Sequence, residues 1–291
     1  MRWIVHSIRM AAASALAAVS VGAQARTLSV GDARLNYVVA GSGPAVVLIH
    51  GWALNLREWH DQIAALAPSH RVIAYDRRGY GRSTGFADPS AEPGDTRTLL
   101  DTLGIRAAVL VGHSAGAEVA ERFAAAMPDR VVGLVLYGGP PPDGFPGVPP
   151  RAADARRAIA RQHGADSVLR MALADPRFRP GPNRSRSMAA RLDSILSEYS
   201  GSDLTHDHPS SQAFPPARLD DLRTWRFPVL FVSGEHEAPR WHEISDSLVR
   251  WMPNARKLVV PGGGHGVHFD EPDRFNAALL DFLREAVPGR R

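Results

Sequence analysis

Residues 107–128 read AAVLVGHSAGAEVAERFAAAMP, and this stretch decides the fold. It begins with Ala107–Val111, a run that is apolar on both faces, as strands inside a parallel sheet are. A helical pattern follows from Ala115 to Met127 and stops before Pro128. A buried strand that turns directly into a helix is part of a strand–helix–strand unit. The stretch therefore predicts an α/β protein built on a parallel sheet.

The turn between this strand and helix is Gly112-His113-Ser114-Ala115-Gly116, a G-x-S-x-G motif. In this setting the motif predicts a nucleophile elbow, in which a sharp turn strains the serine backbone and the flanking glycines omit β-carbons that would collide. The strain presents Ser114 Oγ at the carboxyl edge of the sheet, where the following helix N-terminus favours negative charge. The motif alone occurs by chance in many chains, but its place between strand and helix predicts Ser114 as a nucleophile.

The same alternation continues in both directions along the chain. We expect a hairpin over 28–39 with its turn at Gly31-Asp32, because alternating apolar positions flank these two residues. Further strands are predicted over 45–49, 72–75, 131–137, 229–232 and 257–260, and helices over 57–66, 243–252 and 272–286. The expected fold class is α/β, with a doubly wound, mostly parallel sheet.

Between Pro140 and Thr224 this alternation breaks. Proline clusters at 140–142 and 149–150 mark the exit from the sheet, and helical patches follow near 152–161 and 188–199. An insertion of this size predicts a helical cap over one end of the sheet, placed after the sixth strand. The expected organisation is a signal peptide over 1–25, a core over 26–142 and 225–291, and a cap over 143–224.

Length and composition fit a single large domain with an insertion. The chain has 291 residues, of which 44% are hydrophobic and 22% charged, as in globular proteins with a sizeable core. The net charge of +4 is spread among 30 acidic residues, so no basic block predicts a nucleic-acid partner. The absence of cysteine excludes disulfides, thiolate zinc sites and a catalytic thiol.

The N-terminus has the three parts of a secretory signal. Arg2 and Arg9 are basic, Met10–Val21 is an alanine-rich apolar run, and Ala23-Gln24-Ala25 is a cleavage signature. The run is too short for a membrane span, which needs ~20 apolar residues. We expect a cleaved signal, export to the periplasm or medium, and no stable membrane insertion afterwards. An N-terminal helix or an uncleaved anchor is the alternative.

His50-Gly51-Trp52 follows the strand predicted over 45–49. An oxyanion hole needs two backbone N–H groups that converge on one point. By position, Ala115 supplies one of these donors and Trp52 the other. The alternative is an ordinary turn at the end of a strand.

Several motifs together resemble the α/β-hydrolase superfamily, in the order found there. They are HGWALNLREW (50–59), YDRRGYGRS (75–83), VGHSAGAE (111–118), VSGEHEAP (232–239) and PGGGHGVHFDEPDRFNAALLDFL (261–283). The chain is similar to the esterase, lactonase and cofactor-free haloperoxidase-like branch from about residue 30 onward, the cap excepted. The resemblance implies a serine, acid and histidine triad that needs neither metal nor organic cofactor.

Carried over to this sequence, the resemblance makes Ser114 the nucleophile and His265 the base. His265 follows three glycines, as the family pattern requires, and is preferred to His268. The family places an aspartate in a G-x-x-D pattern, where this chain has Glu237. Glu237 is therefore the expected acid, and Glu235 and Asp143 are the alternatives.

Other polar residues are expected to be structural. His206-Asp207-His208 resembles part of a metal site, but with no further ligand cluster nearby a solvated cap loop is expected. His50 and His113 are expected to shape loops. In the loop over 75–83, Asp76 and its neighbouring arginines are expected to tie loops together by charged hydrogen bonds.

These features predict acyl transfer to water, as in a carboxylesterase of class EC 3.1.1, acting on a small-molecule ester, lactone or thioester. Serine at the elbow argues against the haloalkane dehalogenases and epoxide hydrolases of this fold, which use aspartate there. Carbon–carbon bond hydrolysis and perhydrolysis remain open, as does a slow-turnover ligand receptor. Candidate pocket residues in the cap, which alternatively form its own small core, are Met171, Phe178, Leu192, Ile195 and Tyr199.

Overall fold

The computed structural model describes residues 24–146, 153–205 and 213–287. The predicted signal segment up to residue 23 and the motif His206-Asp207-His208 lie outside these ranges. In the described part, eight strands form one sheet in the order β1-β2-β4-β3-β5-β6-β7-β8. The strands are β1 Arg26–Val30, β2 Ala33–Ala40, β3 Ala45–Ile49, β4 Arg71–Tyr75, β5 Ala108–His113, β6 Val131–Tyr137, β7 Val229–Gly234 and β8 Ala255–Val260.

The sheet has one antiparallel edge and is otherwise parallel. β1 and β2 form the predicted hairpin, and β2 pairs antiparallel with β4. Every later pairing, from β4 through β3 and β5 to β8, is parallel. The predicted doubly wound, mostly parallel sheet is therefore confirmed.

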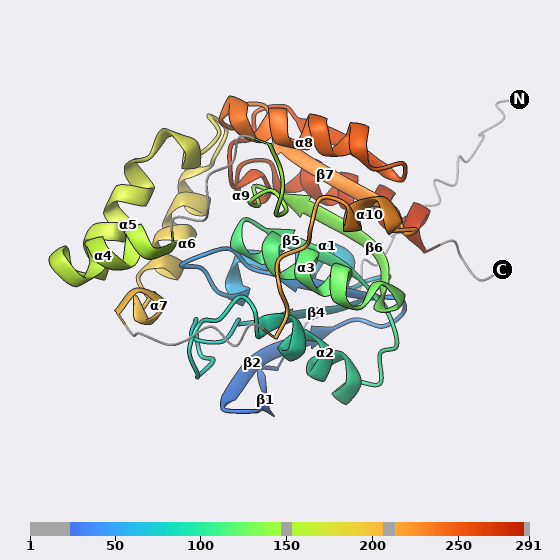
Figure 1. Ribbon diagram of the computed structural model, residues 1–291, viewed down its shortest axis with the longest axis horizontal. Coiled ribbons are helices and arrows are strands. Elements are labelled where there is room, and N and C mark those ends of the chain that lie inside the picture. The colour runs from blue at the N-terminus through green and yellow to red at the C-terminus, as the bar shows by residue number, and fades with distance from the viewer. Residues whose placement is uncertain (1–23, 147–152, 206–212, 288–291) are drawn as a thin grey trace, which may run out of the picture.

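Helices cover both faces of this sheet (Figure 1). Successive residues of β3 point to opposite faces, so Val47 packs in one apolar cluster and Leu48 in the other. The first cluster includes residues of α2, α3 and α8, and the second includes residues of α1 and α10. The helices of the core are α1 His60–Leu66, α2 Glu92–Thr102, α3 Ala115–Ala126, α8 Pro239–Trp251, α9 Val267–Asp270 and α10 Pro272–Ala286.

One local prediction needs correction, and the sequence analysis missed one helix. The helix expected over 57–66 is split into the 3-10 turn η1, Leu56–Trp59, and α1. Helix α2 is not predicted by the sequence pattern, because its buried face carries the acidic residues Glu92 and Asp95. Arg77 donates to Glu92 at 2.5 Å and Arg78 to Asp95 at 2.6 Å, so ion pairs take the place of apolar contacts in the first turn, while Leu99 and Leu100 pack in the apolar core.

The insertion between β6 and β7 is helical. It contains α4 Ala153–His163, α5 Ala165–Ala174, the 3-10 turn η3 Pro176–Phe178, α6 Arg186–Leu196 and α7 Ser202–Thr205, and the turn η4 Asp221–Thr224 precedes β7. Met188 and Ile195 of the insertion pack against Leu54, which follows β3, and Phe269, which lies in α9. The insertion thus lies at the carboxyl ends of the parallel strands, to one side of the sheet in Figure 1.

Within the described ranges, we find no helix with the length and apolar character needed to cross a membrane.

Candidate active site

Ser114 occupies the turn between β5 and α3 in a strained conformation. Its φ of 52° and ψ of −115° lie outside the regions that ordinary residues adopt. Its backbone N–H donates to the carbonyl of Tyr137 at the end of β6, at 2.8 Å. Gly116 allows this turn, because a β-carbon there would lie 2.2 Å from the carbonyl oxygen of Ile49. The side chain at 114 is thereby held at the carboxyl edge of the sheet, and it is partly exposed.

His265 lies on the loop after β8 and meets one carboxylate. Its Nδ1 is 3.0 Å from Glu237 Oε1, and the two side chains are 9% and 2% exposed. Glu237 follows β7 and precedes α8. Burial lowers the pKa of His265, and the hydrogen bond to Glu237 opposes this shift. The imidazole is therefore neutral at pH 7 and able to accept a proton.

The serine and the imidazole approach the same two residues after β6. A β-carbon on Gly138 would lie 2.6 Å from His265 Cε1, and one on Gly139 would lie 3.4 Å from the carbonyl oxygen of Ser114. Gly138 has a φ of 62°, which favours glycine, and it leaves the space that the ring fills. Within the described ranges Ser114 Oγ makes no hydrogen bond, so its link to His265 is not formed in this conformation.

The alternative site residues lie elsewhere. Asp143 is exposed and pairs by a backbone bridge with Arg218. The side chain of Glu235 is 56% exposed and accepts from the N–H of Gly262. His268 is buried in α9, where its Nδ1 lies 2.8 Å from the Tyr137 hydroxyl. Of these candidates, Glu237 is the carboxylate that contacts His265.

The loop after β3 lies against the elbow. Burial keeps His50 neutral by lowering its pKa, and its Nε2 accepts from the backbone N–H of Arg77 at 2.9 Å. Trp52 and Ala115, the two expected oxyanion donors, are both partly exposed. The indole N–H of Trp52 donates to Asp203 of α7 at 2.8 Å, so the loop is fastened to the insertion.

Asp203 accepts further hydrogen bonds beside this loop. The hydroxyls of Tyr199 and Tyr80 lie 2.5 Å and 3.3 Å from its carboxylate. The sequence analysis missed Asp203, because a lone acid in a weakly patterned segment gives no signal of its partners. It named Tyr199, which stacks edge-on to the Trp52 ring.

A buried carboxylate also holds the His265 loop. Asp270 of α9 accepts from the N–H groups of Gly264 and Gly181 at 2.7 Å and 2.8 Å, and from Arg184 at 2.6 Å. Gly181 and Arg184 belong to the insertion, so Asp270 joins the insertion to the loop that carries His265. Asp270 lies within the motif over 261–283, but nothing in the sequence identifies Gly181, Arg184 and Gly264 as its hydrogen-bond partners.

The other candidate pocket residues in the insertion differ in position. Phe178 contacts the His265 ring edge-on, with 4.9 Å between the ring centroids. Leu192 and Ile195 pack into the small cluster under the insertion, and Met171 is 56% exposed on α5. Only Phe178 and Tyr199 of the five therefore contact a predicted site residue, His265 or Trp52, within the described ranges.

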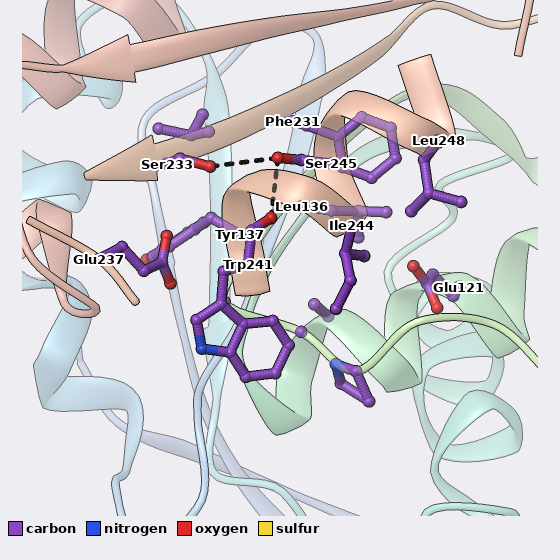
Figure 2. Close-up of a pocket in the computed structure, with 15 residues that line it drawn as sticks. Glu121, Leu136, Tyr137, Phe231, Ser233, Glu237, Trp241, Ile244, Ser245 and Leu248 are labelled. Atoms are coloured by element: carbon purple, nitrogen blue, oxygen red, sulfur yellow. Dashed lines mark hydrogen bonds between the residues drawn. The ribbon is translucent and has the colours of Figure 1, made fainter. Parts of the chain in front are cut away.

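A small cavity lies behind Glu237 (Figure 2). Its volume is about 30 Å³, enough for one or two water molecules. Figure 2 shows Glu237 at one end, Glu121 of α3 at the other and Trp241 between them. Burial raises the pKa of Glu121 to about 8, so this second carboxyl is largely protonated at neutral pH.

The loop over 75–83 ties segments together, as predicted. Asp76 accepts from the N–H groups of Leu56 and Arg82 and from the amide of Asn36, each at 2.8 Å. Its arginine neighbours pair with α2 instead, as described above. Asp76 and its arginine neighbours thus tie this loop to η1, β2 and α2 by charged hydrogen bonds, as the sequence analysis expects.

Comparisons with known proteins agree with this architecture. The fluoroacetate dehalogenase of a Burkholderia species is 39% identical over 92% of this chain and 96% of its own length. The non-heme haloperoxidase of Rhodococcus erythropolis is 32% identical over 84% and 93% of the two chains. A thermophilic esterase from Thermogutta terrifontis superposes with a TM-score of 0.76 and 26% identity, over 91% of this chain and 99% of that one. A family model described as the alpha/beta hydrolase family matches residues 46–278, and the chain therefore belongs to this enzyme family.

Proposed function

We propose that this protein is a serine hydrolase that cleaves an ester or a related acyl bond, such as a lactone or thioester, through an acyl-enzyme on Ser114. The observation that carries the proposal is the buried His265–Glu237 pair, which lies beside Gly138 while Ser114 meets the adjacent Gly139. A strained serine and a neutral, carboxylate-bound imidazole that both lie against the Gly138-Gly139 segment are the groups that acyl transfer needs. The similarity to an esterase structure supports the same reading.

In the proposed reaction, Ser114 Oγ attacks the carbonyl carbon and its proton passes to His265 Nε2. Glu237 accepts the hydrogen bond from Nδ1–H and stabilises the imidazolium. The N–H groups of Trp52 and Ala115 receive the oxyanion, where removal of one donor typically costs ~10²-fold in rate. His265 returns the proton to the leaving group, and water then cleaves the acyl-enzyme by the same steps.

The test is hydrolysis of p-nitrophenyl acetate and butyrate by wild type and Ser114→Ala. We expect the variant to lose at least ~10³-fold in kcat, since the nucleophile is gone while the fold is kept. Equal rates in the two proteins would overturn the proposal and favour a slow-turnover receptor.

Fluoroacetate serves as the comparison substrate, because the dehalogenase relative raises dehalogenation as an alternative. We expect no fluoride release, since serine stands at position 114.

We also propose that the protein is exported after cleavage between Ala25 and Arg26. The position of β1, whose first residue is Arg26, supports this proposal, because cleavage there leaves every strand intact. Intact-mass measurement of the protein recovered from the periplasm or medium should give Arg26 as the first residue. A cytoplasmic protein that retains Met1 would contradict it.

A further inference from the structure

Glu58 of η1 is the feature of the site that the proposed mechanism does not use. Its side chain is 0% exposed, although a carboxyl group is costly to bury. Neither carboxyl oxygen faces an arginine or lysine at ion-pair distance among the described residues. Glu58 instead contacts three segments: the loop after β3 that carries Trp52 (the oxyanion loop), the elbow that carries Ser114, and the segment after His265.

Three separate segments meet at this one side chain. Oε2 accepts from the backbone N–H of Gly51 at 3.2 Å, and Oε1 lies 3.1 Å from Nδ1 of His113. Gly51 precedes Trp52 in the chain, and His113 precedes Ser114. Oε1 also lies 3.6 Å from Nε2 of His268, three residues after His265.

We propose that Glu58 is a positioning residue that fixes the oxyanion loop and the nucleophile elbow relative to each other through two hydrogen bonds from one buried carboxyl group. This inference rests on the proposed function, since it concerns the geometry of that same acyl-transfer site. The two hydrogen bonds join Gly51 and His113, which are far apart in sequence. Each of these residues directly precedes a site residue, Trp52 or Ser114. If either hydrogen bond is lost, the Trp52 N–H and Ser114 Oγ can shift relative to each other.

The protonation of the cluster agrees with a role in hydrogen bonding. Burial raises the pKa of Glu58 well above its usual value, and burial lowers the pKa of His113 to about 4. Both shifts favour the neutral forms of the two groups, in which the carboxylic acid donates to His113 Nδ1 and its other oxygen accepts from Gly51. His268 is held by Tyr137 and by stacking on Trp59 at 5.0 Å, which keeps the cluster closely packed.

Three substitutions separate hydrogen bonding from charge. Glu58→Gln keeps the length, one acceptor for Gly51 and a donor for His113. Glu58→Asp keeps the acidic group but is one methylene too short to reach both partners. Glu58→Met keeps the length and volume but has no strong acceptor. The matched control is Glu121→Met, which changes another buried glutamate that makes no hydrogen bond or ion pair with the three segments among the described residues.

We expect Glu58→Gln and Glu121→Met to keep kcat for p-nitrophenyl acetate within about 3-fold of wild type. Glu58→Asp and Glu58→Met should lose ~10- to 100-fold in kcat with little change in KM, because an ångström of misplacement has effects of this size. The rate at which a fluorophosphonate labels Ser114, followed by intact-mass measurement, should fall in Glu58→Asp and Glu58→Met and stay near wild type in Glu58→Gln and Glu121→Met. Thermal unfolding checks that each variant is folded.

A slow Glu58→Gln variant would overturn the inference, because a negative charge or a metal ion on Glu58, His113 and His268 would then be what matters. Normal rates in Glu58→Asp and Glu58→Met would overturn it as well. If Glu58→Met does not fold, the comparison of Gln with Asp decides the matter alone. Failure of the proposed function can be told apart from failure of the Glu58 inference. In that case, the wild-type protein itself would not be labelled at Ser114.

Discussion

At the scale of single residues, the site depends on where side chains are missing as much as on where they are present. Gly138 leaves the space beside β6 that the His265 ring fills. Its φ of 62° would also strain any other residue, so a substitution there combines a backbone cost with a steric one. A second glycine separates the two effects. Gly31 has a similar φ of 55°, but no atom lies within 4 Å of the β-carbon it would gain.

Gly138→Ala should lower kcat by ~10²-fold, because the new methyl group would displace the imidazole from Ser114 by a large part of an ångström. Gly31→Ala should lower the melting temperature through the same backbone strain and leave kcat unchanged. Steady-state kinetics and thermal unfolding of the two variants measure this difference. If both variants kept full activity, the place of the His265 ring against Gly138 would have no functional meaning.

At the scale of elements, the helical insertion is joined to both loops that carry the proposed chemistry. Asp203 of α7 holds the Trp52 side chain, and Asp270 of α9 binds the N–H of Gly181 and the guanidinium of Arg184. The loop after β3 and the His265 loop are thus both attached to the insertion. These contacts support the prediction that the insertion acts as a cap.

Asp203→Ala removes the acceptor shared by Trp52, Tyr80 and Tyr199, and for the buried Tyr80 hydroxyl the lost partner costs about 1–3 kcal/mol. We expect kcat/KM to fall by roughly 10-fold as the cap and the oxyanion loop come apart. Asp175→Ala is the control, since Asp175 lies in the same insertion and pairs with the exposed Arg177. Indistinguishable kinetics in the two variants would contradict a link between α7 and the oxyanion hole.

At the scale of the whole molecule, buried acids fall into two groups. Glu92 and Asp95 are paired with Arg77 and Arg78, and these pairs fix α2 to the loop after β4. Glu121 differs, because it forms no ion pair among the described residues; burial raises its pKa to about 8, and the charge of the adjacent Arg122 offsets only part of this effect. The folded protein therefore holds a proton on Glu121 that the unfolded chain releases near pH 4.5.

This difference makes stability depend on pH with a definite sign. Below pH 4.5 both states hold the proton, and between pH 4.5 and about 8 only the folded state does, so stability falls as the pH rises through that window. Glu121→Met removes this loss. The difference in melting temperature between Glu121→Met and wild type should therefore increase from pH 5 to pH 8.5. The increase should be about 2–4 °C for each kcal/mol of unfolding free energy that wild type loses over this range.

Differential scanning calorimetry at pH 5, 7 and 8.5 measures this trend. Glu243→Met is the control, because the side chain of Glu243 is 66% exposed and its substitution should give no pH-dependent difference. A constant offset between wild type and Glu121→Met at all three pH values would show that Glu121 titrates normally.

The sequence by itself determined the features that repeat or that act locally. The apolar runs of β3 to β8 and the helical pattern after Ser114 follow from side-chain periodicity, so the sheet and its covering helices other than α2 were predictable. The G-x-S-x-G turn was predictable for a similar reason, since its strain and its two glycines lie within five residues.

The tertiary structure alone decided which distant side chains meet. The family resemblance favoured Glu237 and left Glu235 and Asp143 as alternatives, but only the folded chain brings Glu237 to His265 and leaves the other two exposed. Helix α2 and the contacts of Glu58 were hidden because burial of a polar residue depends on partners tens of residues away. Local propensity carries no information about such partners, since the free energy that fixes them arises only after the sheet has formed.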